Sequence, residues 1–237
     1  MGKEFQFKYF NISQDRSLLK VGTDSMLLGA LASANAPQKG LDLGAGTGVL
    51  SLMLAQKYPD LRIDAIEMDG PSCIDCSDNF SNSKWASRLH CIHADYYEQS
   101  LKQGYDLIFS NPPFYLERAD QIRAENEQSK HTDENKLFEL FKRVYYLLAH
   151  QGVFWTVLPY AHYDRVLSYC KDIGLHVNDC FVIDAKSSKP KSRVVLSISH
   201  NTEPIKTHHL VLRNEDNTYT EAYIKLTKEF HFKQLKK

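Results

Sequence analysis

Hydrophobic and polar residues follow two alternating patterns along the chain from residue 39 onward. Short apolar runs have the length of buried strands, and the segments between them have the residue spacing and composition of helices. The predicted strands lie near Leu41 and at residues 63–68, 89–93, 107–109 and 153–158, and the predicted helices at residues 49–57, 71–82, 137–148 and 163–173. Strands that alternate with helices indicate βαβ units and a parallel sheet.

The last third of the chain has a different pattern. Two β-rich runs at 177–183 and 194–199 are separated only by polar residues, KSSKPKSR, so we expect a loop at 186–193 between two antiparallel strands. A strand at 209–212 and a helix at 220–230 follow. The predicted fold class is α/β, a doubly wound, mostly parallel seven-stranded sheet with an antiparallel strand pair at one side.

The length of the chain fits one large domain. It has 237 residues, of which 43% are hydrophobic, which is enough to bury a sizeable core. We therefore predict a single domain over 1–237. Within it, residues 1–36 form a lead-in segment with a short helix capped by Thr23 or Asp24, and residues 201–237 form a C-terminal strand and helix with a basic tail.

A glycine-rich turn follows the first predicted strand. Residues 41–50 read LDLGAGTGVL, with Gly44, Gly46 and Gly48 in alternation, and glycine lets the backbone adopt positive φ and approach a ligand closely. A dinucleotide-binding turn would need glycine at the position of Val49, so a pyrophosphate is the weaker prediction. Backbone N–H groups at a helix start suit a carboxylate. We predict S-adenosylmethionine, which has both a carboxylate and an ammonium group, as the cofactor.

Carboxylates stand at the ends of three successive predicted strands. Asp42 could face the ammonium group of the cofactor, Glu67 could hold both ribose hydroxyls, and Asp95 could accept a hydrogen bond from the adenine amino group. Each acid alone also fits an ordinary strand-end or N-cap carboxylate. Their placement together with the glycine turn favours a cofactor site.

The predicted strand at 107–109 ends in the sequence SNPPF. Pro112 and Pro113 stop the strand and present Asn111 and Phe114 at its carboxyl end, where open α/β sheets bind ligands. The Asn111 side-chain oxygen and the Pro112 carbonyl could each accept a proton of an exocyclic amino group, and Phe114 could stack on the base. Asn111 is also predicted among the cofactor-binding residues. The alternative is a plain proline turn, since Asn-Pro and Pro-Pro are common turn dipeptides.

Several of these segments resemble a known superfamily. DLGAGTG, IEMD, HADY and SNPPF are similar to the successive motifs of class I S-adenosylmethionine-dependent methyltransferases, which have a Rossmann-like fold. QDRSLLKVGTDSMLLGA at 14–30 and YIKLTKEF at 223–230 resemble the bacterial tRNA1(Val) adenine-37 N6-methyltransferases, and the resemblance covers nearly the whole chain. It implies methyl transfer to the N6 atom of an adenine in tRNA, with Asn111, Pro112, Pro113 and Phe114 as the catalytic residues.

A charged stretch at 116–136 directly follows this motif. It is longer than the roughly 12 to 15 residues that compact domains usually leave without secondary structure, so we expect a lid beside the site. The family resemblance implies basic residues and a histidine in this loop, and Arg123, Lys130 and His131 stand in roughly those places.

The net charge of the chain is zero, with 29 basic and 29 acidic residues. Contacts to RNA phosphates must therefore come from local patches. One predicted patch lies in the loop and consists of Lys186, Lys189, Lys191 and Arg193. The other lies at the end of the chain and consists of Lys225, Lys228, Lys233, Lys236 and Lys237, with Phe230 and Phe232 interleaved. Both also fit a solvated surface, but charge mixed with aromatic residues is typical of RNA binding.

The cysteines and the hydropathy pattern argue against other classes of protein. The five cysteines, Cys73, Cys76, Cys91, Cys170 and Cys180, form an odd and scattered set, so we predict neither disulfides nor a metal site. No apolar run approaches the ~20 residues of a membrane span. We expect a cytoplasmic protein whose partner is tRNA, with no metal and no membrane.

Two other functions stay open at this level. A glutamine N5-methyltransferase must also activate a nitrogen whose lone pair is delocalised, and it could use the same Asn-Pro-Pro motif. Such enzymes have a motif that resembles NPPY, and they have a helical domain before the glycine turn. A non-catalytic RNA-binding or cofactor-binding protein could also keep this fold. Transfer of labelled methyl groups to tRNA would separate the three readings.

Overall fold

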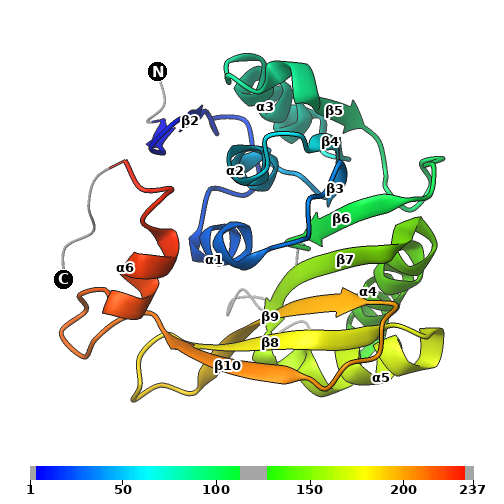
Figure 1. The fold of residues 1–237 in the computed structure, drawn as a ribbon, viewed down its shortest axis with the longest axis vertical. Helices are drawn as coiled ribbons and strands as arrows, with labels where there is room; N and C mark the ends of the chain where they lie inside the picture. Colours follow the sequence, from blue (N-terminus) through cyan, green and yellow to red (C-terminus); the bar gives the residue numbers. More distant parts are fainter. Residues whose placement is uncertain (1–3, 113–126, 233–237) are drawn as a thin grey trace.

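The computed structural model describes residues 4–112 and 127–232 (Figure 1). An eight-stranded sheet has the order β10-β8-β9-β7-β6-β3-β4-β5. Its strands are β3 (Lys39–Leu43), β4 (Arg62–Glu67), β5 (Leu89–His93), β6 (Tyr105–Ser110), β7 (Leu148–Pro159), β8 (His176–Asp184), β9 (Lys191–Ser199) and β10 (Lys206–Val211). Only β9 runs antiparallel to its neighbours, β7 and β8. β10 pairs parallel with β8 and makes eight strands where the sequence predicts seven.

Helices cover both faces of this sheet. They are α1 (Thr23–Leu31), α2 (Val49–Lys57), α3 (Gly70–Ser81), α4 (Glu127–Leu147), α5 (Tyr163–Ile173) and α6 (Glu221–Thr227). Side chains of α1, α2 and α3 share one core with Leu107 and Phe109 of β6. Side chains of α4 and α5 share a second core with Ile108. Alternate residues of the strand thus enter different cores, which confirms the doubly wound α/β prediction.

The predicted start of α4 is wrong. Residues 127–136 of the expected lid belong to α4, because Glu, Gln and Lys favour helix and no proline interrupts them. Residues 113–126, with Pro113, Phe114 and Arg123, lie outside the described residues. The end of α4 at Leu147 agrees with the predicted helix end to within one residue. Gly152 lies inside β7. A Cβ atom there would lie 2.6 Å from the backbone oxygen of Tyr105, so glycine permits the close approach of β7 to β6.

Two smaller corrections concern α1 and the basic loop. The N-cap of α1 is Gly22, without a side-chain capping bond, and Thr23 is the first helical residue. Lys191 and Arg193 lie in β9 and not in a loop, since backbone pairing with β8 extends to Lys191.

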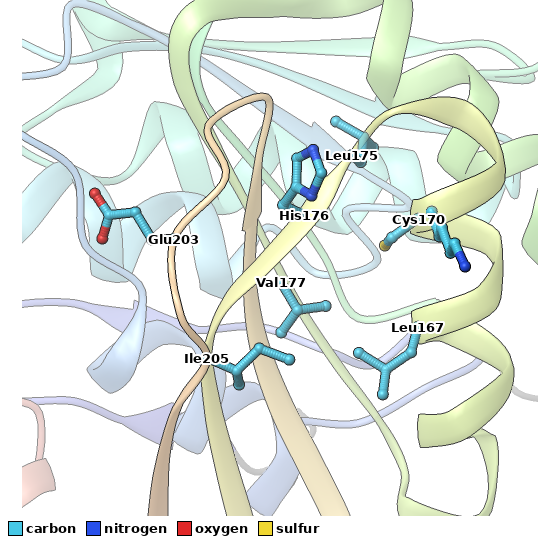
Figure 2. A pocket seen from close by; sticks show the side chains of 8 residues that line it. Leu167, Cys170, Leu175, His176, Val177, Glu203 and Ile205 are labelled. Carbon is cyan, nitrogen blue, oxygen red and sulfur yellow. The ribbon is translucent and has the colours of Figure 1, made fainter.

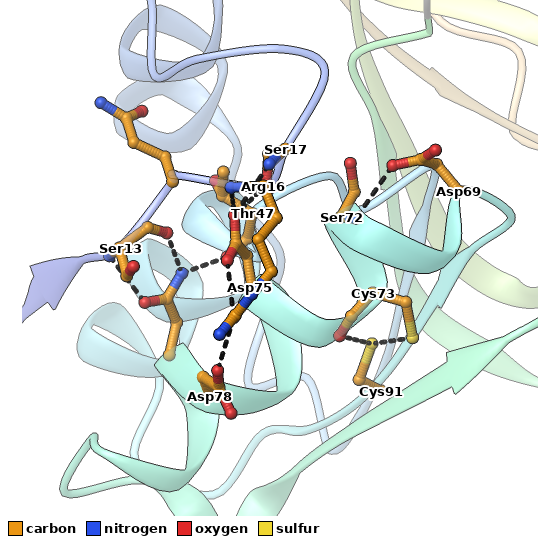
Figure 3. A network of polar contacts seen from close by, with 12 residues as sticks. Ser13, Arg16, Ser17, Thr47, Asp69, Ser72, Cys73, Asp75, Asp78 and Cys91 are labelled. Carbon is orange, nitrogen blue, oxygen red and sulfur yellow. Dashed lines mark hydrogen bonds and ion pairs between the residues drawn. The ribbon is translucent and has the colours of Figure 1, made fainter. Parts of the chain in front are cut away.

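The lead-in segment is bound to α3 by a buried carboxylate (Figure 3). Asp75 is fully buried and accepts hydrogen bonds from the Ser17 backbone N–H and hydroxyl, both at 2.8 Å, and from the Arg16 backbone N–H at 2.9 Å. The Arg16 guanidinium contacts Asp75 at 3.1 Å. Asn79 of α3 bonds the Ser13 backbone and also the Thr47 carbonyl. Through α3 the lead-in is therefore connected to the glycine-rich turn.

We expect Asp75→Ala to lower the free energy of unfolding by about 3 kcal/mol at pH 7, because it leaves buried donors and a guanidinium without their partner. Burial alone would raise the pKa of Asp75, but the bonds from Ser17 and Arg16 outweigh burial and hold the pKa below its usual value. This stabilisation is present above the unfolded-state pKa of about 3.9 and is lost as pH falls through the lower folded-state pKa. Urea unfolding at several pH values measures both effects.

Asp78→Ala is the matched control for this experiment. Asp78 also contacts Arg16, at 2.8 Å, but its side chain is half exposed, and exposed ion pairs contribute about 0–1 kcal/mol. An equal loss of stability in the two variants would contradict the special role of the buried carboxylate.

Candidate active site

The glycine-rich turn between β3 and α2 has the conformation that its sequence predicts. Gly44, Gly46 and Gly48 have φ values of 77°, 56° and 76°. At Gly48 a Cβ would lie 2.5 Å from the Phe80 ring, whereas at Gly46 it would meet nothing within 4 Å. Gly48 therefore permits packing on α3, and Gly46 faces open space that a ligand can occupy.

Glu67, the last residue of β4, closes this turn. Its carboxylate accepts a hydrogen bond from the Gly46 N–H at 2.7 Å and from the Asp69 N–H at 2.8 Å. Each carboxylate oxygen has two lone pairs, so both can still accept a hydroxyl. The side chain is 8% exposed, which places a fixed negative charge at the edge of the open space.

The structure corrects the prediction for Asp42. This side chain has no exposed surface; one oxygen accepts from the Ser51 hydroxyl at 2.7 Å and the other has no hydrogen-bond partner. Burial raises the pKa of Asp42 to about 7, since desolvation disfavours the charged form. Asp42 therefore does not present its carboxylate to an ammonium group directly, and instead links β3 to α2 beneath the turn.

Asp95 lies where β5 ends and is partly exposed. Its side chain accepts from the Tyr97 N–H at 2.8 Å, and its carbonyl accepts from Gln99 at 2.9 Å. The carboxylate thus caps a local turn and stands at the same sheet edge as Glu67, because β4 and β5 are parallel neighbours.

Asn111 and Pro112 follow β6, the parallel neighbour of β3. The Ser110 hydroxyl donates to the Leu43 carbonyl at 2.6 Å, which joins the end of β6 to the start of the glycine-rich turn. The Asn111 side-chain N–H donates to the Ser25 hydroxyl of α1 at 3.3 Å. The structure therefore brings Asn111, the turn and Glu67 to one edge, together with Ser25.

The basic residues predicted to bind RNA are only partly free. Lys186 donates to the Glu215 carbonyl at 2.9 Å and Lys191 to the Tyr160 hydroxyl at 3.1 Å. Arg193 forms an ion pair with Asp24 at 2.9 Å. Lys189 is exposed.

These basic residues lie at the same edge of the sheet as Asn111. Arg193 pairs with Pro159 at the carboxyl end of β7, and β7 is the parallel neighbour of β6. Of the second patch, Lys225 and Lys228 are exposed, while Lys233, Lys236 and Lys237 lie outside the described residues.

A hollow between α5 and β8 is a separate feature (Figure 2). Apolar side chains form much of its lining, with His176 and Glu203 also present. None of the predicted site residues lines it. Within residues 4–112 and 127–232, no group of three or more His, Cys, Asp or Glu is arranged to hold a metal ion. In the same part of the chain, every helix is too short or too polar to cross a membrane.

A glycine-rich turn, a strand-end glutamate and this doubly wound sheet define an S-adenosylmethionine-dependent methyltransferase. Residues 17–168 match the family model "Methyltransferase small domain". The chain belongs to this family and, within it, to the bacterial proteins named tRNA1(Val) (adenine(37)-N6)-methyltransferase.

Two relatives illustrate the match. The protein of that name from Flavobacterium psychrophilum is 34% identical over 97% of this chain and 99% of its own. The one from Vibrio vulnificus is 33% identical over 98% and 96%.

Solved structures agree on the fold. A predicted O-methyltransferase from Agrobacterium tumefaciens superposes with a TM-score of 0.68 at 13% identity, over 87% of this chain and 96% of that one. The O-methyltransferase of neocarzinostatin biosynthesis, in complex with S-adenosylmethionine, superposes with a TM-score of 0.55 at 12% identity, over 74% of this chain and 53% of that one.

Proposed function

We propose that this protein transfers a methyl group from S-adenosylmethionine to the N6 atom of adenine 37 in tRNA1(Val). The observation that supports this most directly is the placement of Asn111. Its amide N–H is already bonded to Ser25, so its oxygen is the group left to accept a hydrogen bond from the substrate. It stands beside the glycine-rich turn, as a methyl acceptor and a methyl donor require.

The open space at the glycine-rich turn fits the cofactor. A Cβ at Gly46 would enter unoccupied space, and Glu67 holds a fixed carboxylate beside it. Glu67 would bind the ribose hydroxyls, and the backbone of Gly44 to Gly48 would lie against the amino-acid part. Asp95 would accept from the adenine amino group. When bound, S-adenosylmethionine supplies a methyl group activated by a sulfonium.

Asn111 and Pro112 would prepare the nucleophile. The N6 lone pair of adenine is delocalised into the ring, which makes the nitrogen a poor nucleophile. When the Asn111 oxygen and the Pro112 carbonyl each accept a hydrogen bond from one N6 hydrogen, the lone pair is localised and directed toward the methyl group. Catalysis is then mainly orientation. The methylated nitrogen is cationic and acidic, so it loses one proton to solvent after the transfer and no strong base is needed. Phe114 is proposed to stack on the base, contributing about 1–3 kcal/mol.

We further propose that the chain forms one methyltransferase domain and acts in the cytoplasm, where it meets tRNA. Support for one domain comes from the two chain ends, which are far apart in sequence but in contact. Phe7 forms a backbone bridge with His231, and the Lys8 N–H donates to the Phe230 carbonyl at 2.9 Å.

The direct test of the function uses cofactor labelled in its methyl group, the purified protein and bulk tRNA. We expect N6-methyladenosine in the digested nucleosides, and mass mapping should place it at position 37 of tRNA1(Val). Label in a glutamine side chain of added protein would instead support the N5-methyltransferase alternative. Cofactor binding without any transfer would support the non-catalytic one.

A prediction about RNA docking follows from the position of the basic residues. Replacing both Lys189 and Lys191 by glutamate should weaken tRNA binding and lower the slope of log affinity against log salt by about 2, since each lysine neutralises one phosphate. The methylated nucleoside should not change, because phosphate contacts carry no sequence information. Filter binding at several salt concentrations measures this effect.

The control for this prediction replaces Lys102 and Lys171 by glutamate. Both are exposed and stand just before β6 and β8, away from the carboxyl ends of the parallel strands. If the Lys189 and Lys191 variant and the control have the same affinity and salt slope, this surface is not part of the docking site.

A further inference from the structure

The first turn of α1 contacts two elements that are remote in sequence. The Ser25 hydroxyl accepts the Asn111 side-chain N–H at 3.3 Å. The neighbouring Asp24 accepts from the Arg193 guanidinium of β9 at 2.9 Å, and Arg193 also donates to the Ser192 carbonyl at 3.0 Å. One helical turn is therefore attached both to the residue after β6 and to the start of β9.

The contact with Ser25 holds the Asn111 side chain in place. A primary amide has an acceptor oxygen at one end and a donor NH2 group at the other. In the structure the NH2 end donates to the Ser25 hydroxyl, which leaves the oxygen for the N6 hydrogens of the base. Ser25 is only 9% exposed, so its hydroxyl has little access to competing water. Because a hydroxyl can donate as well as accept, this contact fixes the position of the amide.

The ion pair determines where that hydroxyl lies. The N-cap of α1 is Gly22, which has no side-chain capping bond, so the helix start is not held by a cap of its own. Asp24 lies in the first turn, and its bond to Arg193 attaches the turn to the sheet. Arg193 pairs with Pro159 at the end of β7, beside β6.

We propose that Ser25 is a positioning residue for Asn111, and that the Arg193–Asp24 ion pair holds the helical turn that places Ser25. This inference rests on the proposed N6-methyl transfer and assigns Arg193 to positioning instead of to RNA binding.

The first experiment measures single-turnover methyl transfer to tRNA by Ser25→Ala with excess enzyme. We expect the rate constant of the chemical step to fall about tenfold, as misplacement of a reacting group does, while the dissociation constants for cofactor and tRNA stay within about twofold of the parent values. Ser197→Ala is the control, because it also removes a buried, hydrogen-bonded hydroxyl and should leave the rate constant unchanged. A parental rate constant in Ser25→Ala overturns the proposal.

A second experiment repeats the substitution in an Asn111→Ala background. Alanine has no amide, so Ser25 has no side chain to position. Ser25→Ala should then change the residual single-turnover rate by less than about twofold, since the interaction energy of the pair is lost. The same tenfold loss in both backgrounds would show that Ser25 acts by another route and would overturn the proposal.

The third experiment is a double-mutant cycle of Asp24→Asn and Arg193→Gln. If the two residues act as one unit, each single variant lowers the rate constant about equally, the double variant is no worse, and tRNA affinity is unchanged. If Arg193 binds RNA, Arg193→Gln weakens tRNA binding even when Asp24 is already Asn, and the assignment to positioning is wrong. Glu229→Gln breaks the exposed Lys8–Glu229 pair at 3.0 Å and serves as the control.

The parent protein in the same assay separates the two levels of inference. If it forms no N6-methyladenosine, the proposed function fails. If it does and the Ser25 and Arg193 variants match it, the function stands and the positioning role fails.

Discussion

Asn111→Ala is expected to lower the rate constant of methyl transfer by about 10²- to 10³-fold, the usual loss when one group that stabilises a transition state is removed. The affinity for S-adenosylmethionine should stay close to the parent value. The physical reason is that the Asn111 amide bonds Ser25 on one side and, in the proposed mechanism, the N6 protons on the other. Its removal takes away a substrate contact and leaves the glycine-rich turn and Glu67 intact.

Single-turnover transfer and calorimetric titration with the cofactor measure the two quantities. Asn35→Ala, in the exposed segment after α1, is the control for a lost amide. If Asn111→Ala keeps its fold by circular dichroism but loses cofactor binding, Asn111 belongs to the cofactor site and the assignment to the base is wrong. A variant with parental turnover would remove Asn111 from the mechanism.

Glu67→Ala, in contrast to Asn111→Ala, should act first on the cofactor and weaken its binding by about 100-fold. The substitution removes the acceptor for the proposed ribose hydroxyls and also leaves the Gly46 and Asp69 N–H groups without their partners. An unsatisfied buried donor costs about 1–3 kcal/mol, and a factor of 100 in affinity corresponds to about 2.7 kcal/mol. The turn would lose its conformation as well as its ligand contact.

Glu67→Gln separates these two contributions. The amide keeps one acceptor oxygen, so it can still take one of the two backbone bonds, and its affinity should lie between those of the parent and Glu67→Ala. Glu98→Ala, an exposed acid after β5, is the control for loss of charge. Cofactor titration and the melting temperature of each variant provide the measurements, and parental affinity in Glu67→Ala would exclude the predicted ribose contact.

Local patterns in the sequence predicted the elements that depend on local chemistry. The bounds of α2, α5 and β5 agree with the prediction to the residue. For the helices, Gly48 directly precedes α2 and Gly174 directly follows α5, and glycine is typical of such positions. The glycine-rich turn was predicted for the same reason: positive φ at Gly44, Gly46 and Gly48 is a property of glycine itself. The Asn111 position followed from the prolines after it.

The sequence could not show contacts between distant residues. Asp42 was predicted to face the cofactor because it ends a strand, but its carboxylate is buried and accepts a hydrogen bond from Ser51 of α2. RNA binding by Arg193 stays a prediction, and nothing in the sequence indicated its ion pair with Asp24, 169 residues away. Side-chain periodicity shows which face a residue occupies and not which residue it meets there.

Contacts of Phe7 and Lys8 with residues 230–231 have a consequence for synthesis on the ribosome. Phe7 is 2% exposed in the folded protein, and the partners of the lead-in at this point, Phe230 and His231, follow the last strand of the sheet in the sequence. A nascent chain therefore cannot complete the packing around Phe7 until all eight strands of the sheet have been made. Apolar surface left open on unfinished chains favours aggregation, so the aromatic lead-in is the segment that a chaperone would need to shield until residues 230–231 have been made.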